Sequence, residues 1–232
     1  MEQLIETDKY LLLGINGSDS IFWDACMLVY TSISLWIPLA LLLIIVLAKN
    51  NSAKNFLILL GLIVVLAFMT DGITSTLCKP YFARLRPTRD FELMYAVDVV
   101  NGYRAGLYSF MSSYAGNSFG IATFLMLLIR NRTLSISLIF WAIMNSFTRL
   151  YLGVHFPGDI IAGTTVGILS GVIIYYLYRY ICNKQRGVRH DYISSQYTKS
   201  GYLVSDVYIV LIVLYATFAA IPIIAFFKLL EF

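Results

Sequence analysis

Six long runs of apolar residues alternate with short polar segments along the chain. They cover residues 29–48, 56–77, 113–129, 134–150, 158–181 and 203–229. Because a helix needs about 20 apolar residues to cross the hydrocarbon core of a bilayer, this pattern predicts six transmembrane helices. The third and fourth runs are joined only by Arg130-Asn131-Arg132, which predicts a helical hairpin. We therefore expect an all-α integral membrane bundle that forms a single domain over residues 1–232.

The N-terminal segment has a different pattern. Residues 3–13 (QLIETDKYLLL) mix leucines with acidic and basic side chains. This segment is too short and too charged to span a bilayer, and its mixture is typical of a helix that lies in the membrane interface. Glycines at positions 14 and 17 are expected to end that helix.

Composition supports a membrane protein. The chain is 59% hydrophobic and 13% charged, against roughly 45–50% and 25% in soluble domains. A net charge of +4 is too small to indicate nucleic-acid binding, and no feature indicates an obligate protein partner. Three cysteines without a CxxC pair, namely Cys26, Cys78 and Cys182, are interpreted as free thiols.

Two polar segments carry most of the candidate chemistry. They are KPYFARLRP at residues 79–87 and RLYLGVHFPGD at residues 149–159. Ionisable groups beside membrane spans are costly and tend to be functional. Six spans would place residues 79–112 and 151–157 on the same side as both termini. We therefore expect the two segments to form one site.

The distribution of lysine and arginine bears on orientation. Of the 17 such residues, nine lie on the side opposite the candidate site and eight on the same side. Lys79, Arg86 and Arg149 are explained by the candidate chemistry, and setting them aside leaves nine against five (8 − 3). Because cytoplasmic loops carry the excess of positive charge, the site is predicted to face away from the cytoplasm.

The residue types in the two segments are suited to breaking a phosphate ester. His155 is the candidate nucleophile, and Asp159 can accept a hydrogen bond from its other ring nitrogen. Lys79, Arg86 and Arg149 are candidates to hold the phosphate oxygens and to stabilise the charge of the transition state.

Two serines at the start of the third run could add to this site. Ser112 and Ser113 would offer hydroxyl and backbone N–H groups at a helix N-terminus, which favours anions. The second histidine, His190, lies in a separate basic segment, so no cluster with metal-ligand spacing is present. The sequence implies neither a metal nor another cofactor.

Each assignment has a simpler alternative. His155 could be an interfacial histidine, and Asp159 an ordinary residue of a helical first turn. Arg84 and Arg89 are interpreted as loop or lipid-headgroup contacts, and Arg104 stays open between loop support and substrate contact. Asp71, inside the second apolar run, is expected to form a hydrogen bond to a neighbouring helix. The basic stretch 184–199 is expected to be a cytoplasmic loop near anionic lipid.

In order and spacing, the two segments resemble motifs of the type 2 phosphatidic acid phosphatase family. Its first motif, K-x6-R-P, is matched by Lys79, Arg86 and Pro87. Its third, S-R-x5-H-x3-D, is matched by Arg149, His155 and Asp159, with Thr148 in place of the serine. The second, P-S-G-H, falls on residues 111–114, which read MSSY.

The resemblance implies an activity. It implies hydrolysis of a phosphate or diphosphate on a membrane lipid through a phosphohistidine intermediate. The chain looks most like bacterial undecaprenyl-diphosphatases, which implies undecaprenyl diphosphate as substrate and a bacterial plasma membrane with the site facing the periplasm or exterior. Alternatives are a lipid A or phosphatidylglycerophosphate phosphatase, a lipid-phosphate transferase and, outside the enzymes, a transporter.

The departure at Tyr114 leaves three interpretations open. The family's histidine at this position gives a proton to the leaving group, and a phenol is a weaker acid than an imidazolium ion. The chain could be a natural enzyme that uses Tyr114, an engineered variant of an enzyme, or a catalytically impaired relative that binds lipid phosphates.

Overall fold

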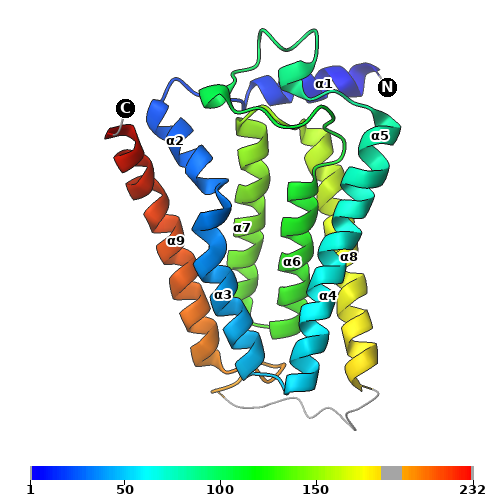
Figure 1. The fold of residues 1–232 in the computed structure, drawn as a ribbon, viewed down its shortest axis with the longest axis vertical. Helices are drawn as coiled ribbons and strands as arrows, with labels where there is room; N and C mark the ends of the chain where they lie inside the picture. Colours follow the sequence, from blue (N-terminus) through cyan, green and yellow to red (C-terminus); the bar gives the residue numbers. More distant parts are fainter. Residues whose placement is uncertain (1, 184–194, 231–232) are drawn as a thin grey trace.

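The computed structural model describes residues 2–183 and 195–230, and helices dominate this part of the chain (Figure 1). The long helices are α1 (Glu2–Leu13), α2 (Ile21–Tyr30), α3 (Ile33–Lys49), α4 (Ala53–Asp71), α6 (Ser113–Ile129), α7 (Arg132–Tyr151), α8 (Pro157–Asn183) and α9 (Val204–Leu230). A π-helical segment, η1 (Gly72–Cys78), continues α4 into the short helix α5 (Lys79–Phe82). Two 3₁₀ turns, η2 (Pro87–Arg89) and η3 (Val100–Gly102), follow within the segment that leads to α6.

The helices form one bundle with α6 near its centre (Figure 1). The helix α6 packs against α4, α7 and α8, while α9 covers α2 and α3. The main core joins apolar side chains from several helices, among them Leu59 and Leu66 of α4, Phe124 of α6, Ile174 of α8 and Leu214 of α9. The predicted all-α fold is therefore confirmed for the described residues.

Six helical units lie at the six apolar runs, where helices were predicted. Fewer of these units qualify as membrane spans. The continuous helix Ala53–Phe82, α8 and α9 are long and apolar enough to cross a membrane, and α2 with α3, bent by 40°, could form a fourth span. The helix α6 has only 17 residues. The buried face of α7 carries Asn145, Ser146 and Arg149, which lower its hydropathy. Six crossings therefore remain a prediction.

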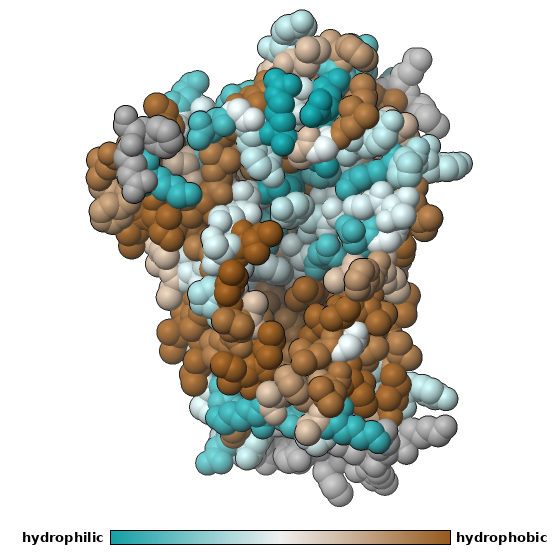
Figure 2. All heavy atoms as spheres, in the orientation of Figure 1, coloured by the Kyte–Doolittle hydropathy of each residue, from teal (hydrophilic) through white to brown (hydrophobic). Residues whose placement is uncertain are grey.

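The surface of the bundle is that of a membrane protein. Large apolar side chains are exposed along the helices, for example Phe68 of α4 at 76% and Ile212 of α9 at 66%. Figure 2 shows apolar side chains over most of the bundle, with hydrophilic side chains gathered toward its two ends. Soluble monomers rarely expose apolar patches of such extent.

The N-terminal helix α1 lies across one end of the bundle, as expected for an interfacial helix (Figure 1). The segment between α5 and α6 lies at the same end, as does the C-terminal end of α9. The connections α3–α4 and α6–α7 lie at the opposite end. The three cysteines are free, as predicted.

Close packing between α6 and α8 depends on glycines at every fourth position. A Cβ atom on Gly163, Gly167 or Gly171 would lie only 2.3, 2.3 or 2.6 Å from a backbone oxygen of α6 or its cap. The oxygens belong to Ser112, Gly116 and Gly120. Small residues at this spacing allow membrane helices to bring their backbones into contact. This contact fixes the start of α6 against the start of α8.

We predict that Gly167→Ala destabilises the protein by about 1–3 kcal/mol, the range of an overpacked core. The new methyl group would collide with backbone, which cannot move aside as a side chain can. The thermal midpoint in detergent measures the effect.

Gly61→Ala is the matched control, because no atom lies within 4 Å of a Cβ at that helical position. This variant should melt at or slightly above the wild-type temperature, since alanine favours a helix by about 1 kcal/mol over glycine. Equal midpoints for the two variants would show that the α6–α8 contact is not tight.

Candidate active site

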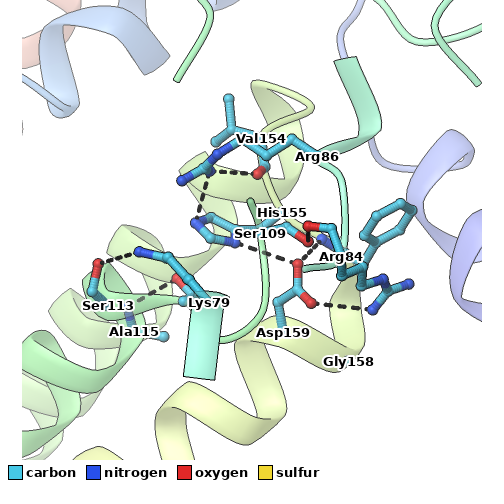
Figure 3. Close-up of polar contacts among 12 residues, drawn as sticks. Lys79, Arg84, Arg86, Ser109, Ser113, Ala115, Val154, His155, Gly158 and Asp159 are labelled. Atoms are coloured by element: carbon cyan, nitrogen blue, oxygen red, sulfur yellow. Dashed lines mark hydrogen bonds and ion pairs between the residues drawn. The ribbon is translucent and has the colours of Figure 1, made fainter. Parts of the chain in front are cut away.

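The two motif-bearing segments meet at the end of the bundle where α1 lies (Figure 3). Arg86, from the segment after α5, donates to the backbone oxygen of Val154 at 2.7 Å and contacts Nε2 of His155 at 3.1 Å. The sequence places these residues about 70 positions apart, and their predicted convergence is confirmed.

The tautomer of His155 follows from its contacts. A guanidinium group can only donate hydrogen bonds. Nε2 of His155 must therefore accept from Arg86, which leaves the ring proton on Nδ1. Nδ1 lies 3.4 Å from Oδ2 of Asp159, and that oxygen also accepts from the backbone N–H of Phe156 at 2.9 Å. The imidazole thus has the lone pair of Nε2 directed toward the cationic side chains.

Burial keeps the imidazole neutral. His155 is 2% exposed and Asp159 is fully buried. Burial lowers the pKa of His155 to about 4, helped by Arg86 and Lys79 and opposed by the hydrogen bond to Asp159. Only the neutral ring can act as a nucleophile, so His155 is competent across the neutral pH range.

Two further cations of the motifs, Lys79 and Arg149, lie near Arg86. The ammonium group of Lys79 donates to the Ser75 hydroxyl at 2.8 Å and lies 3.5 Å from that of Ser113. Arg149 is 1% exposed. In the part of the chain that the structure describes, Nε of Arg86 and Nη2 of Arg149 are buried donors without a hydrogen-bond partner. Buried donors of this kind suit the oxygens of an anion.

Ser112, Ser113 and Tyr114, at the second motif, each contact a different part of the site. Ser112 caps α6, where its hydroxyl accepts from the Ala115 N–H at 3.3 Å, and its own N–H donates to the backbone oxygen of Asp159. Ser113 faces Lys79. The guanidinium carbon of Arg149 lies 4.1 Å from the centroid of the Tyr114 ring, so the two groups stack. Tyr114 is 41% exposed. Tyr114 therefore lies at the cationic cluster.

Arg84 corrects the interpretation made from sequence. It is not a simple loop or headgroup contact, because its Nη1 donates to Oδ1 of Asp159 at 3.1 Å (Figure 3). Its Nη2 donates to Asp8 of α1 at 2.7 Å, and the guanidinium stacks 3.8 Å from the centroid of Phe156. Its spacing of two from Arg86 was the available signal, since alternate residues of an extended segment share a face.

Other charged residues lie outside this cluster. Arg104 is exposed and contacts the backbone oxygen of Thr88 at 3.5 Å, which supports the loop, and Arg89 is also exposed. Asp71 accepts from Ser75 of its own helix at 3.0 Å, and among the described residues no hydrogen bond joins it to the neighbouring helix that was expected as its partner. Tyr103 belongs to none of the motifs and was not singled out from the sequence. Its hydroxyl accepts a hydrogen bond from Nη1 of Arg149 at 3.3 Å.

The described ranges 2–183 and 195–230 contain no group of three histidine, cysteine or acidic side chains placed to hold a metal ion. His190 and most of the basic stretch 184–199 lie outside the described residues.

Comparison with known families identifies the chain. The model of the PAP2 superfamily matches residues 56–182, more than half of the sequence. The chain belongs to the PAP2 superfamily. The expected membership of the type 2 phosphatidic acid phosphatases is therefore confirmed, and the matched range contains all three motif positions.

Two bacterial relatives extend the match beyond this domain. The chain is 39% identical over 178 residues to a lipid A 4'-phosphatase of Bacteroides thetaiotaomicron, covering 76% of this chain and 79% of that protein. It is 29% identical over 189 residues to a lipid A 4'-phosphatase of Porphyromonas gingivalis, covering 81% and 79%. No solved structure matches the chain. These relatives and the apolar helices indicate a bacterial membrane protein.

Proposed function

We propose that this protein is a lipid phosphatase that hydrolyses a phosphate monoester of lipid A, through a phosphohistidine on His155. The observation that carries the proposal is the neutral, buried His155, whose Nε2 faces Arg86 while its Nδ1 faces Asp159. The 39% identity to a lipid A 4'-phosphatase supports this substrate. Neither relative supports undecaprenyl diphosphate as the substrate.

The reaction has two steps. In the first, Nε2 of His155 attacks phosphorus, the P–O bond to the lipid breaks, and the lipid hydroxyl leaves with a proton. In the second, water attacks the phosphohistidine and gives a proton to the Tyr114 oxygen, which releases inorganic phosphate and restores both the imidazole and the phenol. Asp159 holds the Nδ1 proton and stabilises the positive charge that the ring gains in the first step.

The cations and Tyr114 have separate roles in binding the phosphate and in protonating the leaving group. Lys79, Arg86 and Arg149 bind the phosphoryl oxygens and stabilise their charge in the transition state. The Ser113 hydroxyl next to Lys79 adds a donor, and Ser112 holds the start of α6 against Asp159. The Tyr114 ring positions Arg149, and its hydroxyl gives the proton to the leaving oxygen. No step requires a metal.

We predict that His155→Ala abolishes phosphate release, because no other described imidazole can form the intermediate. Release of inorganic phosphate is measured in detergent, with a metal chelator present, from lipid A, phosphatidylglycerophosphate and undecaprenyl diphosphate. The wild type should act on lipid A and form an acid-labile phosphoenzyme, while the variant forms none.

His190→Ala is the matched control, since it removes the other histidine of the chain, and it should keep full activity. Substantial turnover by His155→Ala would refute the covalent mechanism. Wild-type activity on undecaprenyl diphosphate alone would refute the proposed substrate.

We predict that Tyr114→Phe slows lipid A dephosphorylation by about 10²-fold, the low end of the contribution of a general acid. Phenylalanine keeps the ring against Arg149 but removes the hydroxyl. Tyr114→Ala removes both and should lose more. Near-normal turnover by Tyr114→Phe with a large loss in Tyr114→Ala would show that the ring alone matters.

The site is proposed to face the periplasm, based on the nine-to-five excess of lysine and arginine in the segments that the six-span pattern places opposite it. A single cysteine at Glu92, at the site end, should react with an impermeant thiol reagent on cells with a permeabilised outer membrane. A single cysteine at Lys54, exposed at the opposite end, should not. Both are placed in a variant without Cys26, Cys78 and Cys182, and the opposite labelling pattern would invert the orientation.

A further inference from the structure

One carboxylate of α1 binds two donors that belong to the site. Oδ2 of Asp8 accepts from Nη2 of Arg84 at 2.7 Å, and its Oδ1 accepts from the backbone N–H of Gly158 at 2.7 Å. Gly158 lies directly before Asp159 and in the first turn of α8, where an N–H group has no partner within its own helix. Asp8 thus caps a helix from which it is separated by 150 positions in the chain.

Arg84 connects this carboxylate to that of Asp159. Its two terminal nitrogens bind different partners, since Nη1 donates to Asp159 and Nη2 donates to Asp8. The planar guanidinium suits this double contact, because it presents several donors in a fixed geometry. The resulting row of side chains runs from His155 through Asp159 and Arg84 to Asp8 (Figure 3 shows its first three members).

Independent contacts hold α1 in this place. Leu12 of α1 is fully buried in a cluster with Leu93, Val97 and Phe156. Lys9 forms ion pairs with Glu6 of its own helix and with Glu92 of the facing segment. A Cβ atom on Gly158 would lie 3.0 Å from Oδ2 of Asp8, so glycine leaves room for the close approach.

We propose that Asp8 is a positioning residue, through which the interfacial helix α1 fixes the orientation of Asp159 and hence of the nucleophile His155. The assignment of His155 and Asp159 rests on the proposed function. Arg86 contacts the imidazole at Nε2, whereas Asp159 contacts it at Nδ1 and Asp8 lies beyond Asp159, so Asp8 is not placed to hold the phosphate. Loss of Asp8 should therefore slow the chemical step and leave phosphate binding intact.

Asp8→Asn tests this. Its amide has the same shape but offers one acceptor oxygen to two donors, so either Arg84 or Gly158 loses its partner. We expect kcat for lipid A to fall by about 10- to 100-fold, as for a small misplacement of reacting groups. The inhibition constant of inorganic phosphate should stay within about twofold of the wild-type value.

Glu6→Gln is the matched control. It removes one negative charge from the same helix, but its partner is Lys9 and not a residue of the row. This variant should keep the wild-type kcat. An unchanged kcat in Asp8→Asn would overturn the proposal, as would a rise in the phosphate inhibition constant in proportion to the loss of kcat.

Arg84→Lys provides a second variant if Asp8→Asn does not fold. A single ammonium group keeps the charge but cannot place separate nitrogens on Asp8 and Asp159, so kcat should again fall. Combined with Asp8→Asn, it should cause little further loss, because both changes break the same connection. Fully additive losses would contradict a shared role.

A spectroscopic measurement separates this proposal from the proposed function. The Nδ1 proton of His155, bonded to Asp159, should give a low-field proton resonance that His155→Asn abolishes. It should persist in Glu6→Gln and broaden or move upfield in Asp8→Asn, whether or not any lipid is hydrolysed. An identical resonance in Asp8→Asn would refute positioning, whereas absence of wild-type turnover on every lipid would refute only the function.

Discussion

The buried carboxyl group of Asp159 is the point on which the parts of this site depend. Its side chain contacts His155, accepts from the Phe156 N–H and pairs with Arg84, while its backbone oxygen accepts from Ser112 at the start of α6. A buried negative charge needs such partners, because desolvation without them is costly. The carboxyl group and the backbone oxygen of Asp159 together connect the starts of two helices, the segment after α5 and, through Arg84, the N-terminal helix.

Apolar periodicity was sufficient to predict the helical units, because burial in lipid leaves few other ways to satisfy the backbone. It could not predict how the helices pack. The α6–α8 contact depends on backbone approach at Gly163, Gly167 and Gly171, which hydropathy does not register, although the four-residue spacing was visible. The bend between α2 and α3 and the π-helical continuation of α4 also had no clear sequence signal.

For the site, the alternation of apolar runs correctly predicted that the segments of Arg86 and His155 meet, because two polar segments at one end of a bundle have little space in which to separate. It did not reveal Arg84 or Asp8. Arg84 was one of several arginines in a loop, and Asp8 belonged to a helix whose mixed charges suggested only contact with headgroups. Their roles arise from a long-range contact between chain segments that neither composition nor periodicity encodes.

The glycine contact between α6 and α8 also bears on how a lipid reaches the nucleophile. His155 is nearly inaccessible to solvent, and two helices whose backbones touch cannot separate by small shifts of side chains. The route of entry for a bulky headgroup must therefore run elsewhere than between α6 and α8. Residues 79–111 and α1 cover the same end of the bundle (Figure 1). For the proposed function this means that a lipid headgroup has to pass the covering segments, whose spacing would then limit its size.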